Sequence, residues 1–460
     1  MVRLTLETLQ EKPTDLLIVG GGITGLTAAY LAAKANHKVT LIEAGGRFGG
    51  LMRTAPVAGT ALECFYHHFF THDLELHWLL KELGLRDEVF YCPSTMGIFR
   101  NGKIFDFNGP LDLLAFNAIP LWDRIRFGAT SLLMCKCLRW ENWEGVPAVD
   151  WFYRYAGRQS TDAIWAPMLK IKFGSYSDQV PAAWMIGRLR QRVNSNDGGQ
   201  QRLGYLKGSL DVLCTALVNR LAAMGVSLYA NMPAQKLEVQ AGQLTAVHSG
   251  DRRFAAQKFL FTIPTSAIHP LVEPVDTAFA GRLREVEYFG AVCVVLVLKR
   301  PLSHIYWLNI ADAGFPFGGV IEHTNFIDPA TYQNKHIVYL SRYFAAHEEI
   351  ASQDEAAIKG QMLAALRRLN PLLNDAGMEE VFVFKTRTAA NVCGLNFSKK
   401  IPRCTSPIKN MYLAGMPHIY PDERSCNNAI RVVAEACRVM ELGCEDIPRG
   451  PSLAGRIAMA

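Results

Sequence analysis

At 460 residues the chain is long for one compact core, so we expect two interleaved or consecutive domains. Half of the residues are apolar and a fifth are charged, which is typical of globular proteins and excludes long disordered segments. The net charge of +6 comes without a run of closely packed lysines and arginines, so nucleic acid is not an expected partner. An anionic substrate or a membrane surface is compatible with this charge.

The amino-terminal segment "MVRLTLETLQEKPTD" carries acids and lacks an apolar core of signal-peptide length, so we do not expect export. No stretch reaches the ~20 apolar residues that a membrane-spanning helix needs. Eleven cysteines without C-x-x-C spacing are typical of reduced, mostly buried thiols. We therefore expect a cytoplasmic protein without a metal site.

The first predicted elements form a strand, a glycine turn, a helix and a second strand. Residues 15–19 ("DLLIV") indicate a buried strand, "ITGLTAAYLAAKA" has helical spacing, and residues 37–43 form a strand that ends in an acid. The glycines fit G-x-G-x-x-G, which allows a tight turn, close approach of a pyrophosphate, and close packing of helix on strand. The helix amides then face the phosphates, and the acid accepts hydrogen bonds from ribose. The predicted dinucleotide contacts are Gly20, Gly22, Thr24, Gly25 and Glu43.

A second glycine pair follows the acid, in "EAGGRFGGLMRT" (residues 43–54). It suits a ligand longer than NAD, whose far end also lies against backbone. The pattern E-x-x-x-R-x-G-G resembles the FAD signature of the superfamily that contains amine oxidases, protoporphyrinogen oxidase, phytoene desaturases and UDP-galactopyranose mutase. The resemblance implies that Arg47 lies near the FAD phosphates and that Gly49, Gly50 and Leu51 pass close to the flavin.

The resemblance continues in two later blocks. Residues 204–239 combine a glycine turn, a helix and a strand, and the resemblance implies that Ala234 contacts the adenine. Residues 410–440 combine a strand with a helix whose N-terminus faces the flavin's pyrimidine edge in this superfamily. Helix amides there would stabilise negative charge on the reduced flavin. The implied contacts are Gly415, Asn427, Asn428 and Ala429.

One position departs from the superfamily pattern. Many members have an acid directly after the "AG" of the last block, where this chain has Met416. Asp422, Glu423 or backbone amides alone are the alternatives for that contact. Cys426 is the cysteine nearest to the implied flavin, but its context is not that of a covalent tether, so we expect noncovalent FAD.

The three blocks predict an α/β fold: a Rossmann-like FAD-binding domain of the glutathione-reductase type with an inserted α+β substrate domain. The predicted FAD domain is discontinuous and comprises residues 1–74, 203–269 and 387–445. The predicted substrate domain comprises residues 75–202 and 270–386, and residues 446–460 form a tail.

Two polar stretches are candidates for catalysis. In "LECFYHHFFTHD" (residues 62–73), His67 and His68 could move a proton as hydride leaves a substrate, or could be histidines satisfied by backbone in a half-buried strand; for His72 we favour the second interpretation. This string also resembles a histidine-rich segment of UDP-galactopyranose mutase. The polar quartet at residues 322–325 could line a pocket, with Glu322 as the catalytic candidate, or could simply be the exit from a strand.

Two stretches of the substrate domain concern partners. Spacing of two prevents the basic residues of 165–192 from sharing one helix face, so most are expected in solvent and one or two could bind an anionic group. These residues are Lys170, Lys172, Arg188, Arg190 and Arg192. Residues 109–140 mix apolar, aromatic and basic residues. We favour buried helices there, and peripheral contact with the inner face of a membrane is the alternative.

We therefore expect an FAD-dependent oxidoreductase that passes a hydride from a largely apolar, lipid-like small molecule to flavin N5. No second G-x-G-x-x-G unit is present, so the electron acceptor is oxygen, a quinone or another protein. A sugar-nucleotide isomerase like UDP-galactopyranose mutase, which uses reduced flavin, is the alternative. A non-catalytic flavoprotein is the third hypothesis. Sequence alone leaves the substrate and the oligomeric state open.

Overall fold

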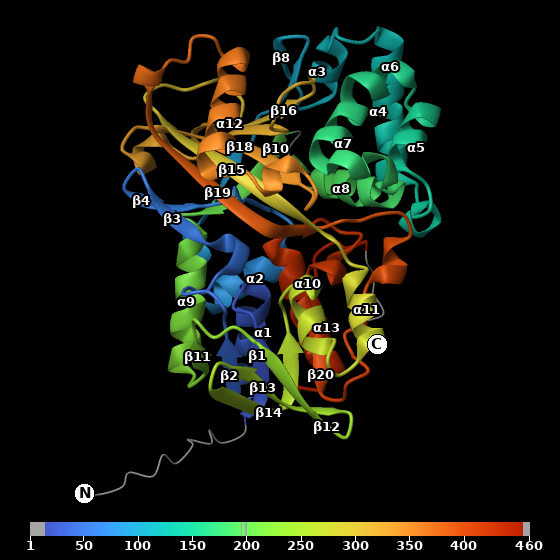
Figure 1. Ribbon diagram of the computed structural model, residues 1–460. Coiled ribbons are helices and arrows are strands. Elements are labelled where there is room, and N and C mark those ends of the chain that lie inside the picture. Colours follow the sequence, from blue (N-terminus) through green and yellow to red (C-terminus); the bar gives the residue numbers. More distant parts are fainter. Residues whose placement is uncertain (1–13, 195, 198–199, 454–460) are drawn as a thin grey trace, which may run out of the picture.

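The computed structural model describes residues 14–194, 196–197 and 200–453, which form two stacked domains (Figure 1). The lower domain of Figure 1 contains a largely parallel sheet with helices on both faces, and the upper domain combines a mainly antiparallel sheet with a group of helices. The expectation of no export signal falls on residues 1–13, and part of the predicted tail falls on residues 454–460. Both segments lie outside the described residues.

The lower sheet has the order β11-β2-β1-β14-β13-β12, and β20 pairs with β14. Its mutually parallel strands are β1 (Thr14–Val19), β2 (Val39–Ile42), β11 (Ser227–Tyr229), β14 (Arg252–Phe261) and β20 (Met411–Leu413). The antiparallel strands β12 (Lys236–Gln240) and β13 (Gln243–Ser249) extend the sheet from β14. The parallel strands are short apolar runs because helices cover both of their faces.

Two sets of helices enclose this sheet. One face packs against α1 (Ile23–Lys34), α2 (Leu74–Glu82), α9 (Leu210–Ala223) and α13 (Cys426–Val439). The other face packs against α10 (Thr265–Val272) and α11 (Thr277–Arg284). The sequence-based boundaries at residues 75 and 270 assign α2 and α11 to the substrate domain. The structure instead places Leu76 and Leu79 of α2, and Phe279 and Leu283 of α11, in the cores around the lower sheet.

The upper sheet has the order β19-β15-β18-β17-β16-β7-β8, antiparallel except between β16 and β7. Its strands are β7 (Met96–Arg100), β8 (Lys103–Asp106), β15 (Tyr288–Leu298), β16 (Trp307–Ile310), β17 (Gly319–Glu322), β18 (His336–Phe344) and β19 (Met378–Asn391). Every residue of β15 is buried because both of its faces are covered. Val292, Val294 and Leu296 face the core that includes α12 (Glu355–Leu369), and the alternate residues face a second core next to the lower domain.

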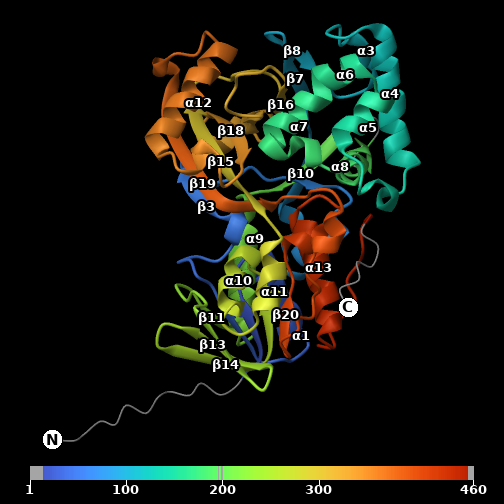
Figure 2. The ribbon, with the colours of Figure 1, turned by 45° about the vertical axis from the view of Figure 1, so that its right-hand side comes forward.

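The helical group of the upper domain surrounds an aromatic core. Its helices are α3 (Pro110–Ala115), α4 (Leu121–Lys136), α5 (Ala148–Tyr155), α6 (Arg158–Ser160), α7 (Ala166–Phe173) and α8 (Ala182–Asn194). The Trp165 ring stacks between Phe127 and Phe152, with centroids 5.1 and 4.3 Å away. At the lower edge of this group, α8 lies above α13 (Figure 2).

Short strands join the domains. The hairpin β3 (Thr54–Val57) and β4 (Thr60–Glu63) leads away from the second glycine pair. The strands β5 (Phe69–Phe70), β6 (Val89–Pro93) and β10 (Gln200–Leu206) form a small sheet at the junction, to which β9 (Asn196–Asp197) is paired. Within the described residues, no helix combines the length and apolarity needed to cross a membrane.

Candidate active site

The first glycine motif forms a cradle between β1 and α1. Gly20 has a φ of +112°, a conformation that favours glycine, and a Cβ on Gly25 would lie 1.9 Å from the Gly20 carbonyl oxygen. Gly22 caps α1, and no side chain caps this helix in its place. A Cβ on Gly22 would lie 3.9 Å from its nearest neighbour, the Cα of Gly50, so the space above Gly22 is open. The α1 amides are therefore presented to an anion.

The second glycine pair completes the cradle from the other side. Gly49 and Gly50 have φ of +119° and +56°, and the Gly49 amide donates to the Gly21 carbonyl at 2.8 Å. A Cβ on Gly50 would lie 3.0 Å from the Cα of Gly22. The two turns thus meet backbone to backbone, and Leu51 follows in a short 3-10 helix (Gly50–Met52).

Glu43 is held rigidly at the edge of this cradle. One carboxylate oxygen accepts from the Gly21 amide and the other from the Gly45 amide, both at 2.7 Å. The Met232 amide donates to the Glu43 carbonyl at 2.8 Å, so the segment that carries Ala234 lies beside this acid. The structure therefore brings together the first glycine motif, the acid and the adenine-side segment predicted from sequence.

Arg47 extends toward α9 at the surface. Its side chain is 71% exposed, and its guanidinium lies 3.5 Å from Asp211 Oδ1. Thr24 lies in the first turn of α1 and is partly buried. Neither geometry conflicts with a phosphate nearby.

The start of α13 is fixed by side-chain hydrogen bonds. Ser425 caps the helix by accepting from the Asn428 amide at 3.1 Å. Asn427 Oδ1 accepts from the Leu76 amide at 2.9 Å, and Asn428 Nδ2 donates to the Glu423 carbonyl at 2.7 Å. Asn427, Asn428 and Ala429 are all buried, and the side chains of the two asparagines are bonded within the protein. Their side chains therefore orient the helix end, and ligand contact at these positions falls to the backbone.

Asp422 and Glu423, the two alternatives to the acid that Met416 replaces, lie in the segment between β20 and α13. Gly415 follows β20, and its amide donates to His418 Nδ1 at 3.1 Å. Asp422 accepts from the Leu453 amide at 2.9 Å, and Glu423 forms an ion pair with Arg188. Both acids therefore serve contacts within the protein.

His67 and His68 lie at the junction of the two domains. His67 Nδ1 donates to the Phe65 carbonyl at 2.5 Å, which leaves the lone pair on Nε2. Burial, with the positive charge of Arg424 as a lesser cause, lowers the pKa of His67 to about 4. His68 Nδ1 lies 3.2 Å from the Tyr306 hydroxyl, and burial together with nearby Arg192 lowers its pKa to about 3. Both imidazoles are neutral at pH 7.

Aromatic rings surround these histidines. The Trp307 ring lies 4.9 Å from the Tyr66 ring and 6.0 Å from the His68 ring, and the Arg192 guanidinium lies 5.8 Å from it. The Ser341 hydroxyl of β18 donates to the Tyr66 hydroxyl oxygen at 3.5 Å. We call these side chains, Tyr66, His68 and Trp307, together with the adjacent His67, the aromatic chamber. Trp307 carries no sequence motif, and the pairing of β16 with β7 and β17 brings it here.

The polar quartet at 322–325 does not join the aromatic chamber. The Glu322 carboxylate accepts from the amides of Leu302 and Ser303, each at 2.7 Å, and is fully buried. Asn325 donates to the Ser303 carbonyl at 2.9 Å. His323 bonds the Tyr332 hydroxyl at 2.7 Å, and the Thr324 hydroxyl accepts from the Ile337 amide. Glu322 and Asn325 thus hold the loop before β16 in place, so we do not carry Glu322 forward as a catalytic residue.

The basic residues of α7 and α8 separate into two groups. Lys170 is exposed, and Arg190 donates to the Cys135 carbonyl at the end of α4 at 2.7 Å. Arg188 and Arg192 share one face of α8 with Trp184, because these positions are four residues apart. Lys172 of α7 and Arg188 both contact the Trp184 ring. His72 lies apart and stacks on Phe70, with ring centroids 5.4 Å apart.

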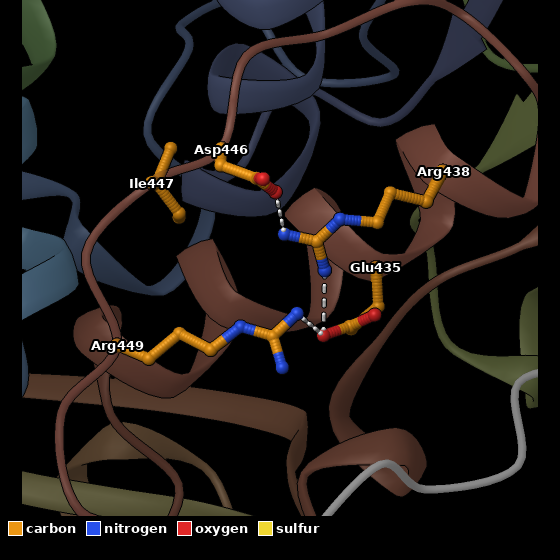
Figure 3. Close-up of a pocket in the computed structure, with 5 residues that line it drawn as sticks. All are labelled: Glu435, Arg438, Asp446, Ile447 and Arg449. Atoms are coloured by element: carbon orange, nitrogen blue, oxygen red, sulfur yellow. Dashed lines mark hydrogen bonds and ion pairs between the residues drawn. The ribbon is translucent and has the colours of Figure 1, made fainter.

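A surface depression of about 440 Å³ lies away from this site, beside the C-terminal half of α13 (Figure 3). Arg438 bonds Asp446 at 2.6 Å and Glu435 at 2.9 Å, and Arg449 reaches the same Glu435 oxygen at 2.5 Å. These charges pair with one another, as Figure 3 shows, and they fasten the C-terminal segment to α13. The depression therefore carries structural ion pairs and lacks the glycine cradle and the histidines.

The parallel sheet, the paired glycine turns at its edge and the second domain stacked above them are the architecture of a two-domain protein with a Rossmann-like domain. The chain belongs to the flavin containing amine oxidoreductase family, whose model matches residues 23–421. The resemblance inferred from the glycine and arginine pattern is confirmed, as is the predicted fold of a Rossmann-like domain with an α+β insertion. The protein is an oxidoreductase of this family.

Similar proteins span several activities. The chain is 24% identical over 438 residues to a 15-cis-phytoene desaturase of Solanum lycopersicum, covering 88% of this chain and 73% of the desaturase. Among solved structures, a putative protoporphyrinogen oxidase of Exiguobacterium sp. 255-15 matches with a TM-score of 0.75 at 17% identity, over 94% of this chain and 99% of that one. A reduced UDP-galactopyranose mutase matches with a TM-score of 0.73 at 13% identity, over 94% and 95%. The two structural matches show a shared fold.

The residues present fit the flavin that the family implies. The open space at Gly22, the α1 amides that no side chain caps, and the fixed carboxylate of Glu43 together match an adenosine diphosphate group. Leu51, which follows the second glycine pair, packs in the same hydrophobic cluster as Tyr66 and Trp307. No side chain of the described residues lies within 3.9 Å of a Cβ placed on Gly22.

Proposed function

We propose that the protein is an FAD-dependent oxidoreductase that removes a hydride from a largely apolar small molecule. The single observation behind this proposal is the open cradle at Gly22, where no side chain caps α1 and from which Leu51 reaches the cluster that contains Tyr66 and Trp307. Bound FAD supplies the hydride acceptor at N5. The remaining roles are performed by side chains and amides of this chain.

In this proposal the lower domain binds and orients the cofactor. The α1 amides hold the phosphates, Glu43 accepts from ribose hydroxyls, and the N-terminus of α13 faces the ring end. Ser425 and Asn427 keep that helix end in place through their hydrogen bonds to the Asn428 and Leu76 amides. Preorganised amides require no rearrangement as negative charge develops, which lowers the barrier.

The upper domain supplies the substrate chamber. The rings of Tyr66 and Trp307 exclude water and offer apolar surface to the substrate. His67 is the proposed proton acceptor, because its Nδ1 is bonded to the Phe65 carbonyl and its neutral Nε2 keeps a lone pair. His68, anchored at the Tyr306 hydroxyl, is proposed to position the substrate beside it.

We propose that the FAD is bound noncovalently. Cys426 is the cysteine closest to the proposed ring end, yet burial raises the pKa of its thiol to about 12. Its Sγ lies 3.4 Å from Met52 Sδ. A thiol in this environment stays protonated and is a poor nucleophile for flavin attachment.

An absorbance spectrum of the purified protein, followed by acid precipitation, tests whether the protein binds FAD and whether that FAD is noncovalent. Flavin bands and a yellow supernatant with the mass of FAD support the proposal, whereas flavin retained in the pellet means a covalent bond. Anaerobic bleaching by apolar donors then tests the reaction type. A protein that binds FAD but is bleached by no donor class would support the non-catalytic alternative.

The second candidate is an isomerase that uses reduced flavin on a sugar nucleotide. The observation that favours it is the basic face of α8 beside the histidines. Titration with a nucleotide sugar separates the two candidates: binding by the reduced protein alone supports the isomerase. A change of substrate redox state without nucleotide binding supports the oxidoreductase.

We further propose that the α3–α4 face contacts the surface of a membrane from the cytoplasm. Its apolar side chains Leu111, Trp122 and Leu132 are 81%, 71% and 59% exposed, and Lys136 and Arg139 lie exposed at the end of α4. Exposed apolar residues with basic neighbours are typical of helices at a lipid interface. The eleven cysteines, all within the described residues, are free thiols, which suits a reducing compartment.

A further inference from the structure

Three cations from distant segments converge at the domain junction. Lys172 lies on α7, Arg188 on α8 and Arg424 just before α13, and together we call them the cation trio. The Lys172 Nζ lies 4.6 Å from the Trp184 ring centroid and 5.8 Å from that of Tyr343. Arg188 lies 5.5 Å from the same Trp184 ring.

Arg424 completes the cluster through the ring that it shares with Lys172. Its guanidinium lies 5.6 Å from the Tyr343 ring centroid and donates to the Tyr343 hydroxyl at 2.7 Å. Trp184 and Tyr343 thus each contact two of the three cations, so the trio occupies one small volume.

The trio has more positive charge than the surrounding protein neutralises. Glu423 forms an ion pair with Arg188. The recorded bonds of Arg424 are to neutral groups, the Ala389 carbonyl and the Tyr343 hydroxyl. Lys172 has no hydrogen bond or ion pair with any residue that the structure describes. The Arg424 guanidinium and, when it is protonated, the Lys172 ammonium therefore remain for a ligand.

Holding such charges together inside the protein is unfavourable without an anion. Burial, followed by the positive charges of Arg188 and Arg424, holds the pKa of Lys172 well below its usual range. Charged groups removed from water are normally paired or hydrogen-bonded. The aromatic faces around Lys172 compensate for this only in part, since cation–π contacts contribute about 0.5–2 kcal/mol.

The packing of α8 builds this arrangement. A Cβ on Gly187 would lie 2.3 Å from the Pro421 carbonyl oxygen, so only glycine lets α8 approach the segment before α13 this closely. That approach places Arg188 beside Glu423 and Arg424. Trp184 and Arg188 are four residues apart and therefore share the helix face toward Lys172.

The cation trio lies beside the aromatic chamber and is separate from the glycine cradle. Arg188 lies one helical turn from Arg192, which contacts the Trp307 ring, and Tyr343 packs in the same hydrophobic cluster as Tyr66 and Trp307. The glycine cradle, in contrast, lies between β1 and α1, where Gly22 faces Gly50. An anion at the trio would therefore be a part of the substrate that lies next to the proposed proton acceptor.

We infer that Lys172, Arg188 and Arg424 bind a phosphate group carried by the substrate, which gives the substrate an apolar body and an anionic end. The inference rests on the proposed function and names the class of molecule that fills the same chamber. Two spare positive charges match the two negative charges of a terminal phosphate, whereas a carboxylate would neutralise one. Forked guanidinium donors also suit phosphate oxygens.

The test uses the FAD-loaded protein and three probes: inorganic pyrophosphate, farnesyl diphosphate and UDP. Binding is measured by calorimetry and by the change that each probe causes in the flavin spectrum. We expect pyrophosphate to bind, and Lys172→Gln or Arg424→Gln to weaken this binding by about tenfold or more, as for loss of one charge-assisted hydrogen bond. Lys170→Gln, a change on the same helix at an exposed position, is expected to leave it unaltered.

Folding is monitored by flavin content and by the thermal midpoint, and Lys172→Arg, which keeps the charge, is expected to restore pyrophosphate binding. Tighter binding of farnesyl diphosphate than of pyrophosphate identifies a lipid phosphate, and binding of UDP alone identifies a nucleotide and thereby favours the isomerase. A yellow protein that binds none of the three probes, or binds them equally after Lys172→Gln and Arg424→Gln, overturns the inference and leaves the oxidoreductase proposal intact. A protein without FAD instead refutes the proposed function.

Discussion

Gly22→Ala separates cofactor binding from folding more cleanly than any other change in the cradle. Gly22 has φ −76° and ψ −178°, which alanine adopts without strain. Its added methyl would meet no atom closer than 3.9 Å. The methyl would instead occupy the open space in front of the α1 amides, where we place the pyrophosphate.

The expected effect on stability is small. Replacing glycine by alanine at a compatible backbone position stabilises by about 0.4–1 kcal/mol through the unfolded chain. Alanine is a poorer N-cap than glycine, which costs a similar amount, up to about 1 kcal/mol. The two effects nearly cancel, so the thermal midpoint of the apoprotein should change by only a few degrees.

The expected effect on FAD is large. A methyl between the amides and the phosphate oxygens lengthens charge-assisted hydrogen bonds worth about 1.5–3 kcal/mol each, so FAD affinity should fall at least tenfold. Flavin fluorescence on titration of apoprotein measures the affinity, and circular dichroism measures the midpoint. Gly25→Ala is the contrasting variant, because its Cβ would lie 1.9 Å from the Gly20 carbonyl oxygen and should destabilise the fold. Wild-type FAD affinity in a folded Gly22→Ala protein would refute the assignment of the cradle.

Three further predictions follow from the buried polar groups and the exposed helix. Glu322→Gln should lower the unfolding free energy by about 1.5–3 kcal/mol with FAD content unchanged, and a loss of turnover without destabilisation would return Glu322 to the catalytic set. Because the folded-state pKa values of His67 and His68, about 4 and 3, lie below the ordinary 6.5, the unfolded chain binds protons first as pH falls. Stability should therefore decrease from about pH 6.5 toward 4, less steeply in His67→Gln, and equal slopes in thermal melts would contradict the burial argument. Trp122→Ser with Leu132→Ser should reduce flotation with anionic vesicles at an unchanged thermal midpoint, and undiminished flotation would refute the proposed membrane face.

The glycine cradle, where we propose that FAD binds, follows from short stretches of sequence. The spacing of Gly20, Gly22 and Gly25 is a requirement of one turn and one helix, and the structure gives each glycine a separate steric reason. Glu43 ends the next strand in sequence, so parallel pairing with β1 places it at the same edge. Interactions within about 30 residues decide all of these positions, which is why a linear pattern reveals them.

The side chains at the proposed substrate site could not be predicted from short stretches of sequence. The quartet at Glu322 had the composition of a pocket lining, but the loop at Leu302 and Ser303 takes its hydrogen bonds. Arg424 carried no recognisable motif, although it contacts β18 through Tyr343. Strand pairing across insertions decides which polar groups are used up internally and which face a ligand.

Sequence alone determined the two glycine turns, the strand and helix between them and the acid beside them, because backbone geometry over a few residues imposes glycine, helix and strand there. Tertiary structure alone decided that Arg188 would meet Glu423, 235 residues further along the chain, and that Lys172 would remain without a carboxylate. Charge balance in a buried volume depends on every segment that reaches it. No single segment carries a sequence signal for that balance.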